Sequence, residues 1–329
     1  MTTIVTGAAG FIGYHVSLSL LSRGERVVGL DNLNNYYDVA LKQARLSRLE
    51  GNPSFQFEQL DISKEVELAS VFQRYGPIQK VVHLAAQAGV RYSIENPMAY
   101  VQSNLVGQVV VLEQCRRHEP FEHLVYASSS SVYGGNTKLP FSTNDPVNTP
   151  ISLYAATKRS DELMGYCYSH LYGIPATGLR FFTVYGPWGR PDMAAYLFTD
   201  AILAGKPIKL FNNGKMKRDF TYIDDIVSGV IAALDRPPGS NDSGENSPPH
   251  KLYNLGNNSP EPLMKFVELL ECALDRKASI EMLPMQPGDV AETYADIAAA
   301  QKDLSFGPRV TIEEGLPLFV SWFREYHGR

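Results

Sequence analysis

Apolar runs alternate with amphipathic segments along the first half of the chain. The runs at 81–86 and 123–127 are almost wholly apolar, as expected for strands that are covered on both faces. Between such runs, apolar residues recur with the spacing of a helix. This pattern predicts strands at 3–6, 26–31, 54–60, 80–85, 122–128 and 175–181, and helices at 14–23, 38–50, 65–74, 98–118 and 154–172.

Strands that alternate with helices predict an α/β fold with a doubly wound parallel sheet. Beyond residue 185 the pattern loosens, and we expect a smaller mixed α/β domain there. We place the first domain at 1–182 and the second at 183–329, with about 224–236 returning to the first. In the second half we expect helices at 193–204, 224–234, 261–274 and 312–326, a strand–turn unit at 207–222 and a strand at 251–255.

Composition narrows the class of protein. Of 329 residues, 44% are apolar and 20% are charged, which is typical of a soluble globular protein, and the net charge of −5 argues against nucleic acid as a partner. The three cysteines lie far apart and predict no disulfide framework, which fits the reducing cytoplasm. We expect no metal site, because no spacing of His or Cys suggests one, and no membrane span, because no apolar run is long enough.

The first turn of the chain carries three glycines between an apolar run and a predicted helix. Gly7, Gly10 and Gly13 would allow the backbone to approach a pyrophosphate at the positive end of that helix. Asp31 ends the next strand 18 residues after Gly13, near the distance expected for an acid that binds ribose hydroxyls. The spacing is G-x-x-G-x-x-G rather than G-x-G-x-x-G, but the order of elements predicts a dinucleotide site.

Tyr154 and Lys158 lie four residues apart and therefore share one face of a predicted helix. A tyrosine acts as a base near pH 7 only if its pKa falls by about 3 units from ~10, and a nearby cation typically supplies 1–3 units. Lys158 and a cationic nicotinamide ring together could supply this shift. The serines at 128–131 end the preceding strand, and one of them could position the reacting oxygen. The alternative is an incidental surface pair.

Together these motifs resemble the extended short-chain dehydrogenase/reductase superfamily, in which the G-x-x-G-x-x-G turn binds NAD. Two further segments, A-G-V-R-Y-S at 88–93 and P-W-G-R-P-D-M-A at 187–194, are most similar to nucleotide-sugar 4-epimerases that act on UDP-glucuronate. The shared motifs are T-G-A-A-G-F-I-G at 6–13, Asp31, Asp61 with Ile62, H-L-A-A-Q at 83–87, Asn104, S-S-x-x-V-Y-G at 128–134 and Y-x-x-x-K at 154–158.

The resemblance implies a Rossmann-like domain with a tightly held NAD. Asp31 would bind the adenosine ribose and repel a 2′-phosphate, which favours NAD over NADP. Asp61 and Ile62 would flank the adenine. The implied cofactor-binding residues are Gly7, Gly10, Phe11, Ile12, Gly13, Asp31, Asn32, Asp61, Ile62, Ala85, Ala86, Gln87, Asn104, Tyr154 and Lys158.

The implied reaction is a reversible 4-epimerisation of UDP-glucuronic acid to UDP-galacturonic acid. Tyr154 would take the proton from the sugar O4 while C4 passes its hydride to the nicotinamide. The 4-keto sugar would then turn over and receive the hydride on its other face. Ser129 would hold O4, and Lys158 would bind the nicotinamide ribose and lower the pKa of Tyr154.

The resemblance also implies a substrate site that grips a uronate. A 4-keto uronate loses CO₂ easily, so its carboxylate must be held firmly, and a charge-assisted arginine contact is worth about 1.5–3 kcal/mol. Decarboxylases and dehydratases of the superfamily usually carry an acid at the place of Ser131, and galactose epimerases usually carry Asn at the place of Thr183. The implied substrate-binding residues are Ser129, Ser130, Ser131, Thr183 and Arg190 for the sugar, Phe211 for the uracil, Arg218 for the diphosphate and Asp289 for the ribose.

Other functions stay open from the sequence. The first alternative is a UDP-glucose or UDP-hexosamine 4-epimerase, followed by a nucleotide-sugar decarboxylase or dehydratase. A non-catalytic NAD(H)-binding regulator is a further alternative, but it predicts a broken Tyr/Lys pair, and Tyr154 and Lys158 are both present. Relatives commonly dimerise through the helices that match 98–118 and 154–172, so we expect a homodimer in the cytoplasm.

Overall fold

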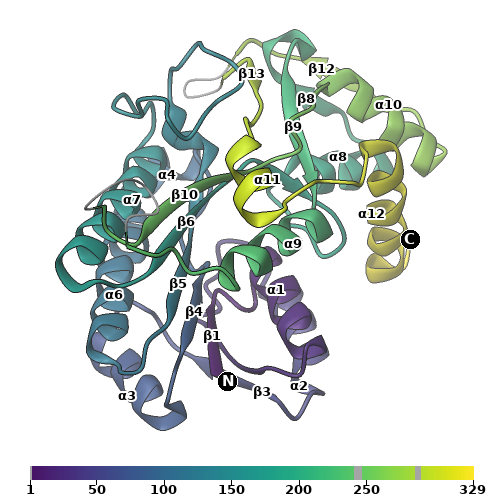
Figure 1. Ribbon diagram of the computed structural model, residues 1–329. Coiled ribbons are helices and arrows are strands. Elements are labelled where there is room, and N and C mark those ends of the chain that lie inside the picture. Colours follow the sequence, from purple (N-terminus) through teal and green to yellow (C-terminus); the bar gives the residue numbers. More distant parts are fainter. Residues whose placement is uncertain (1, 241–246, 286–289) are drawn as a thin grey trace.

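The computed structural model describes residues 2–240, 247–285 and 290–329. Its centre is a seven-stranded sheet in the order β10–β6–β5–β4–β1–β2–β3, and every neighbouring pair is parallel (Figure 1). This confirms the doubly wound α/β fold that the sequence predicts. The strands are β1 (Thr2–Thr6), β2 (Arg26–Asp31), β3 (Phe55–Gln59), β4 (Lys80–His83), β5 (His123–Ser129), β6 (Ala176–Phe181) and β10 (His250–Leu255).

Helices cover both faces of the sheet, because successive side chains of each buried strand point to opposite faces. Val5 of β1 belongs to a core shared with the helices of one face, and its neighbour Ile4 belongs to a second core on the other face. The first face carries α1 (Phe11–Ser22), α2 (Val39–Glu50) and α9 (Ile223–Leu234), and the second carries α3 (Glu65–Tyr75), α6 (Gly107–Arg117) and α7 (Leu153–Tyr172).

The helix expected at 98–118 is interrupted. It begins as the short α5 (Pro97–Tyr100), passes through a π-helical turn at Val101–Val106 and continues as α6. A π-helical turn inside a helix often marks a functional site. Here the turn contains the buried Asn104, whose side chain faces the wall of the ligand cleft described below.

The second half of the chain builds a smaller lobe around strand β9 (Figure 1). Short strands and one short helix in this half were not expected from the sequence, because elements of two to seven residues show too little periodicity. The strands are β7 (Thr183–Tyr185), β8 (Ile208–Leu210), β9 (Lys217–Tyr222), β11 (Pro260–Pro262), β12 (Ile280–Met282) and β13 (Glu292–Thr293), and the helices are α8 (Ala194–Leu203), α10 (Leu263–Leu274), α11 (Ala298–Leu304) and α12 (Ile312–His327).

The chain crosses between the two lobes more than once. After β9 it enters α9, which packs against α1, and then β10, which adds to the sheet beside β6. The carboxyl ends of the sheet strands thus face the smaller lobe, the place where open α/β sheets hold their ligands. Within the described ranges, no helix combines the length and the apolar character that a membrane crossing needs.

Candidate active site

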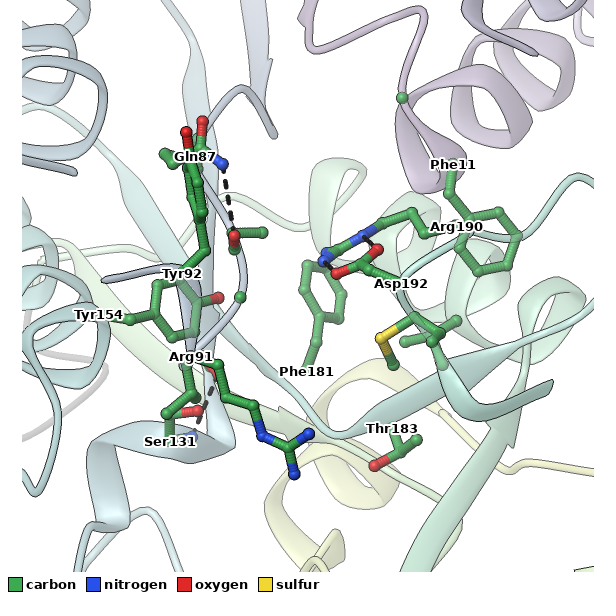
Figure 2. A pocket seen from close by; sticks show the side chains of 18 of the residues that line it. Phe11, Gln87, Arg91, Tyr92, Ser131, Tyr154, Phe181, Thr183, Arg190 and Asp192 are labelled. Carbon is green, nitrogen blue, oxygen red and sulfur yellow. Dashed lines mark hydrogen bonds and ion pairs between the residues drawn. The ribbon is translucent and has the colours of Figure 1, made fainter. Parts of the chain in front are cut away.

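A cleft of about 970 Å³ runs along the carboxyl ends of the sheet strands and is lined by both lobes. Figure 2 shows Gln87, Tyr154 and Ser131 on the wall of the sheet domain, with Thr183, Arg190 and Asp192 facing them from the other side. The volume and the two-sided lining suit a ligand the size of a dinucleotide together with a sugar nucleotide.

The glycine turn forms one end of the cleft. Gly7 has a φ of +71°, which favours glycine, and a Cβ on it would lie 2.9 Å from the Ala85 nitrogen. A Cβ on Gly13 would lie 2.1 Å from the Gly7 oxygen, so helix α1 could not begin so close to β1 with any larger residue. Gly10 precedes α1 and has no side chain to cap it, which leaves the helix N–H groups open to an anion in the cleft.

Asp31 lies at the end of β2, where the sequence placed it, and it lines the cleft. Its Oδ1 accepts a hydrogen bond from the Leu33 amide at 2.8 Å and lies 3.7 Å from the Lys42 Nζ. Burial lowers the pKa of Lys42, against the opposing attraction of Asp31. The carboxylate of Asp31 is therefore fixed at the wall, with its second oxygen available for a ribose hydroxyl.

Asp61 and Ile62 follow β3 and line the same end of the cleft together with Asn32. The Asp61 Oδ1 accepts hydrogen bonds from the Ser63 amide and hydroxyl at 2.9 Å and 2.7 Å, and its Oδ2 accepts one from Asn32 at 3.3 Å. Although burial works against ionisation, these hydrogen bonds hold the pKa of Asp61 below its usual range. The carboxylate is therefore charged and rigid beside the predicted adenine position.

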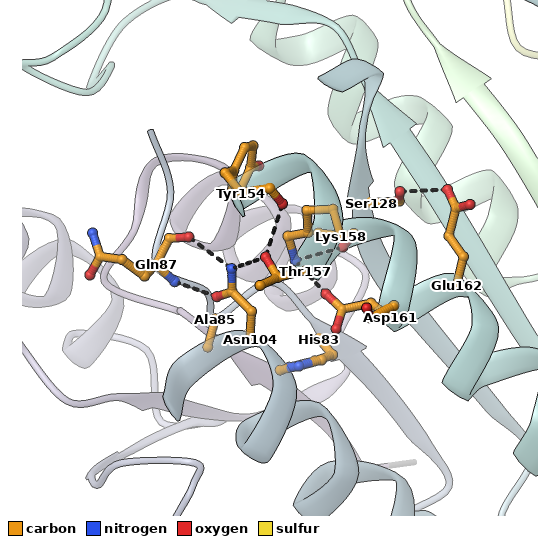
Figure 3. Close-up of polar contacts among 12 residues, drawn as sticks. His83, Ala85, Gln87, Asn104, Ser128, Tyr154, Thr157, Lys158, Asp161 and Glu162 are labelled. Carbon is orange, nitrogen blue, oxygen red and sulfur yellow. Dashed lines mark hydrogen bonds and ion pairs between the residues drawn. The ribbon is translucent and has the colours of Figure 1, made fainter. Parts of the chain in front are cut away.

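The structure places Asn104 behind the wall of the cleft, and its part in cofactor binding stays a prediction. Its side chain accepts a hydrogen bond from the Gln87 amide at 2.8 Å and donates to the Gln87 carbonyl at 3.1 Å (Figure 3). It also donates to Thr157 on α7 at 3.0 Å. Asn104 thus fastens Gln87, which does line the cleft together with Ala85 and Ala86.

Tyr154 and Lys158 of α7 both reach the cleft, beside the serines that end β5. The Tyr154 ring packs edge to face against Tyr100, with 6.0 Å between the ring centroids. Ser129 lines the cleft, and its hydroxyl accepts a hydrogen bond from the Ser131 amide at 3.1 Å. Tyr154, Lys158 and Ser129 therefore all line the same cleft, and their catalytic roles stay predictions.

The opposite wall presents Thr183 and Arg190, which the sequence predicts as the carboxylate grip. The Arg190 guanidinium forms a bidentate ion pair with Asp192, at 3.0 Å from Nε and 2.5 Å from the second nitrogen. Tyr36, from the sheet domain, donates a hydrogen bond to the same Asp192 at 3.2 Å. The ion pair uses two of the five N–H donors of the Arg190 guanidinium, so three others could take part in binding a ligand.

The loop that carries Arg190 is anchored from α2 by a fully buried arginine, Arg45. Its guanidinium donates to the carbonyls of Trp188 at 2.7 Å and Gly189 at 3.3 Å. It also donates to the Ala9 carbonyl of the glycine turn at 2.9 Å. One side chain therefore connects the cofactor turn with the predicted carboxylate loop.

Two of the three residues predicted to bind the UDP part of the substrate belong to the same cleft. Phe211 and Arg218 both line it, and the Arg91 guanidinium stacks over the Phe211 ring at 4.3 Å. Arg218 also donates to the Lys217 and Ala291 carbonyls, at 2.9 Å and 3.2 Å. Asp289, the predicted ribose ligand, lies outside the described residues.

Several residues of the site were not found from the sequence. Lys42 lies in an ordinary amphipathic helix pattern, and nothing in that pattern marks it as a neighbour of Asp31. Asp192 and Arg91 lie within motifs that the sequence analysis quotes, but their partners Arg190 and Phe211 are visible only in three dimensions.

The residues present fit a dinucleotide. A Cβ would fill the cradle at Gly7 and Gly13, the amide groups of α1 are open, and Asp31 and Asp61 offer fixed acceptors at one end. Across the described ranges, no group of three or more His, Cys, Asp or Glu side chains is placed to hold a metal ion.

Comparisons with known proteins agree with this geometry. A family model described as the NAD dependent epimerase/dehydratase family matches residues 3–256. The chain is 50% identical to UDP-glucuronate 4-epimerase 4 of Arabidopsis thaliana over 335 residues, which cover 100% of this chain and 76% of that protein.

Two solved structures extend the similarity to three dimensions. A crystal structure of a UDP-glucuronic acid 4-epimerase from Bacillus cereus, in complex with UDP-glucuronic acid and NAD, superposes with a TM-score of 0.90 at 34% identity, over 99% of this chain and 100% of that one. A UDP-glucose 4-epimerase with UDP-glucose, from Thermotoga maritima, gives a TM-score of 0.87 at 30% identity, over 99% and 100% of the two chains.

Proposed function

The chain belongs to the NAD-dependent epimerase/dehydratase family, and from that premise we propose that it interconverts UDP-glucuronate and UDP-galacturonate by inverting C4. The observation that carries the proposal is that the predicted catalytic residues and the predicted carboxylate-binding residues line the same cleft. Tyr154, Lys158 and Ser129 lie on one wall, and the Thr183–Arg190 wall faces them. The cofactor is NAD, which, when bound, would supply a reversible hydride acceptor for the sugar C4.

In this mechanism Tyr154 removes the O4 proton and later gives it back. The Ser129 hydroxyl orients O4, and Lys158 holds the nicotinamide ribose with a donor that points into the cleft. Two of the three N–H donors of the Lys158 ammonium group bind the Ala127 carbonyl and the Asp161 carboxylate, both at 3.0 Å, so the ammonium group is fixed in place. Closure of the site by the two lobes would exclude water and protect the 4-keto sugar.

The groups around the sugar favour epimerisation over elimination. At the place where a decarboxylase would carry an acid, Ser131 offers only a hydroxyl, which supplies no further acid or base for loss of CO₂. Arg190, Thr183, Ser130 and Ser131 are our proposed ligands of the uronate carboxylate. They would keep the C–C bond to the carboxylate out of line with the carbonyl π system.

The test is a mixed-substrate assay with purified protein. UDP-glucuronate, UDP-glucose and UDP-N-acetylglucosamine are offered together, and the products are separated by ion-exchange chromatography and weighed by mass spectrometry. We expect UDP-galacturonate as the main product. Turnover confined to the neutral sugars would assign the protein to the alternative 4-epimerases, and UDP-xylose would make it a decarboxylase.

We further propose that two copies of the chain form a homodimer through α6 and α7. These helices lie side by side and expose the apolar side chains of Val109, Leu163 and Tyr166, two of them at least half exposed. A second copy would cover this face. Light scattering after gel filtration should give twice the mass of 36.5 kDa, and Leu163→Glu should return it to the single-chain mass.

A cytoplasmic location is the last part of the proposal. Cys115, Cys167 and Cys272 are all free thiols, and the last two are exposed, which fits a reducing compartment. Cell fractionation with an antibody against the protein tests this. Recovery with the membrane or secreted fraction would contradict it.

A further inference from the structure

Lys158 has an acidic partner that the catalytic motif does not include. Its Nζ donates to the Ala127 carbonyl of β5 and to the Asp161 Oδ2, each at 3.0 Å. Figure 3 shows the contact between Lys158 and Asp161. The Asp161 side chain is 2% exposed and the Lys158 side chain 5%, so water screens the pair little. Asp161 lies one turn after Lys158 on α7 and does not line the cleft.

The pair is not a fully satisfied structural ion pair. The second carboxylate oxygen of Asp161, Oδ1, is buried and has no hydrogen-bond partner among the described residues. A buried oxygen of this kind costs about 1–3 kcal/mol of stability. Burial raises the pKa of Asp161 to about 6, although Lys158 pulls it down. An asparagine at position 161 would have the same shape without the buried negative charge. We therefore look for the role of the Asp161 carboxylate in its effect on Lys158.

Other charges near the pair are matched by partners of their own. Glu162, the next residue on α7, is held by Arg180 of β6 at 2.7 Å and 2.9 Å and by Arg159 at 2.8 Å. His83 of β4 is uncharged, because burial and the neighbouring Lys158 lower its pKa to about 3.

From β5, Tyr126 faces the acids of α7, and burial followed by their negative charge keeps its pKa well above the usual value, so it stays neutral. On the side of Tyr154 that faces α7 and the sheet, two charges therefore remain: the positive charge of Lys158 and the negative charge of Asp161, which partly cancels it.

We propose that Asp161 is a positioning residue that fixes the Lys158 ammonium and offsets part of its charge, and so sets how strongly that ammonium acidifies the Tyr154 phenol. The proposal rests on the proposed function. A reversible epimerisation needs Tyr154 to take the O4 proton and also to return it. An unopposed buried ammonium beside the phenol would stabilise the phenolate and make it a weaker base for O4.

The test is Asp161→Asn, which keeps the size and the acceptor for Lys158 but removes the charge. The pH dependence of kcat is measured with UDP-glucuronate, and phenolate absorbance is titrated in the NAD-loaded protein, with Tyr154→Phe as the spectral blank. We expect the acidic limb of kcat and the Tyr154 titration to move down by about 1 pH unit, at the low end of what one neighbouring charge does. Asp161→Ala is the second neutral variant.

Asp200→Asn is the matched control, because Asp200 forms an exposed pair with Arg329 and does not line the cleft, and it should move neither curve. If both neutral variants lose activity with unmoved curves, or if neither folds, Asp161 has a structural role and the proposal is overturned. If the unaltered protein does not epimerise UDP-glucuronate, the proposed function fails, while the absorbance titration still decides the role of Asp161.

Discussion

At the scale of single residues, the phenolic oxygen of Tyr154 is the group on which turnover depends most. Tyr154→Phe removes this oxygen and keeps the ring that packs against Tyr100. Because a positioned acid or base contributes about 10²–10⁴-fold, kcat should fall by that factor. Melting temperature and co-purified NAD, measured by mass spectrometry, should stay unchanged. Activity within tenfold of the unaltered protein would contradict the assignment.

Arg190 should decide the choice between uronates and neutral sugars. Since Arg190 and Asp192 pair, removing only the arginine would leave a partly buried acid without its cationic partner, so the variant is Arg190→Gln with Asp192→Asn. Loss of a charge-assisted contact of about 1.5–3 kcal/mol should raise KM for UDP-glucuronate by about 10- to 150-fold.

Turnover of UDP-glucose should change little in the same double variant, and Asp192→Asn alone serves as its control. A loosened carboxylate should also release some UDP-xylose, which mass spectrometry detects. An equal loss with both sugars would mean that Arg190 shapes the loop and does not bind the carboxylate.

The residues that could be found from the sequence are those whose chemistry follows from spacing along the chain. Gly7 and Gly13 are fixed by a turn, and Tyr154 and Lys158 by one turn of a helix. Asp161 escaped notice even though it is only three residues from Lys158, because its role depends on burial and on an oxygen without a partner.

At the scale of elements, the loop at 187–190 is held by α2 through Arg45. Trp188 in this loop has a φ of +63°, which is strained for a residue other than glycine, and the two hydrogen bonds from Arg45 to its carbonyl hold it there. Arg45→Lys keeps the charge but not the forked geometry. Since small misplacements of a binding group cost up to about 10²-fold, kcat/KM for UDP-glucuronate should fall by about 10- to 100-fold.

Turnover of UDP-glucose should fall less, because it does not use Arg190. Arg74→Lys is the matched control, since Arg74 is exposed, pairs with Glu58 and does not line the cleft. Parallel assays with both sugars measure the effect. If Arg45→Lys lowers both activities equally and also releases NAD, the clamp would serve the glycine turn and not the loop.

Long elements were predictable because many residues repeat one pattern. The twelve residues of α2 (Val39–Glu50) agree with the expected 38–50, and the buried strand β2 was placed to the residue. The two residues of β13 carry no such pattern, and they pair with β9 only because the chain returns there from far away. The π-helical turn at Val101–Val106 could not be foreseen, because its apolar spacing resembles that of an ordinary helix.

At the scale of the whole molecule, the sequence predicted the family and the parallel sheet correctly, since motifs and alternation both run through the first 180 residues. The boundary at 182/183 stays a prediction, because α9 and β10 lie beyond it in the chain yet pack with the sheet layer. The return of α9 and β10 to the sheet depends on contacts between segments far apart in the chain. The local spacing of apolar residues does not contain this information.

The same packing buries three histidines and partly buries a fourth, all in neutral form, and this should govern the acid stability of the protein. Burial is the main reason that the pKa values of His15, His123 and His250 fall to about 4 and that of His83 to about 3. In the unfolded chain each titrates near ~6.5. Because the pKa of each histidine is lower in the folded protein, its contribution to the free energy of unfolding is fully present above pH ~6.5. This contribution is lost as the pH falls toward 4, at about 1.4 kcal/mol per pH unit for each histidine.

Two buried acids act in the opposite sense but are outnumbered. Burial raises the pKa of both Asp161 and Asp219 to about 6, so protonation below pH 6 favours the folded state, and each offsets about one histidine. The melting temperature should therefore be flat above pH 6.5 and fall steeply below pH 6.

The variant that tests this is His123→Asn, because its amide can still donate to the Leu234 carbonyl as the imidazole Nδ1 does. It should make the fall in melting temperature shallower by about a quarter to a half, because the two acids already offset two of the four histidines. The exposed His170→Asn should leave the slope unchanged, and an equal slope in His123→Asn would mean that acid unfolding begins elsewhere in the molecule.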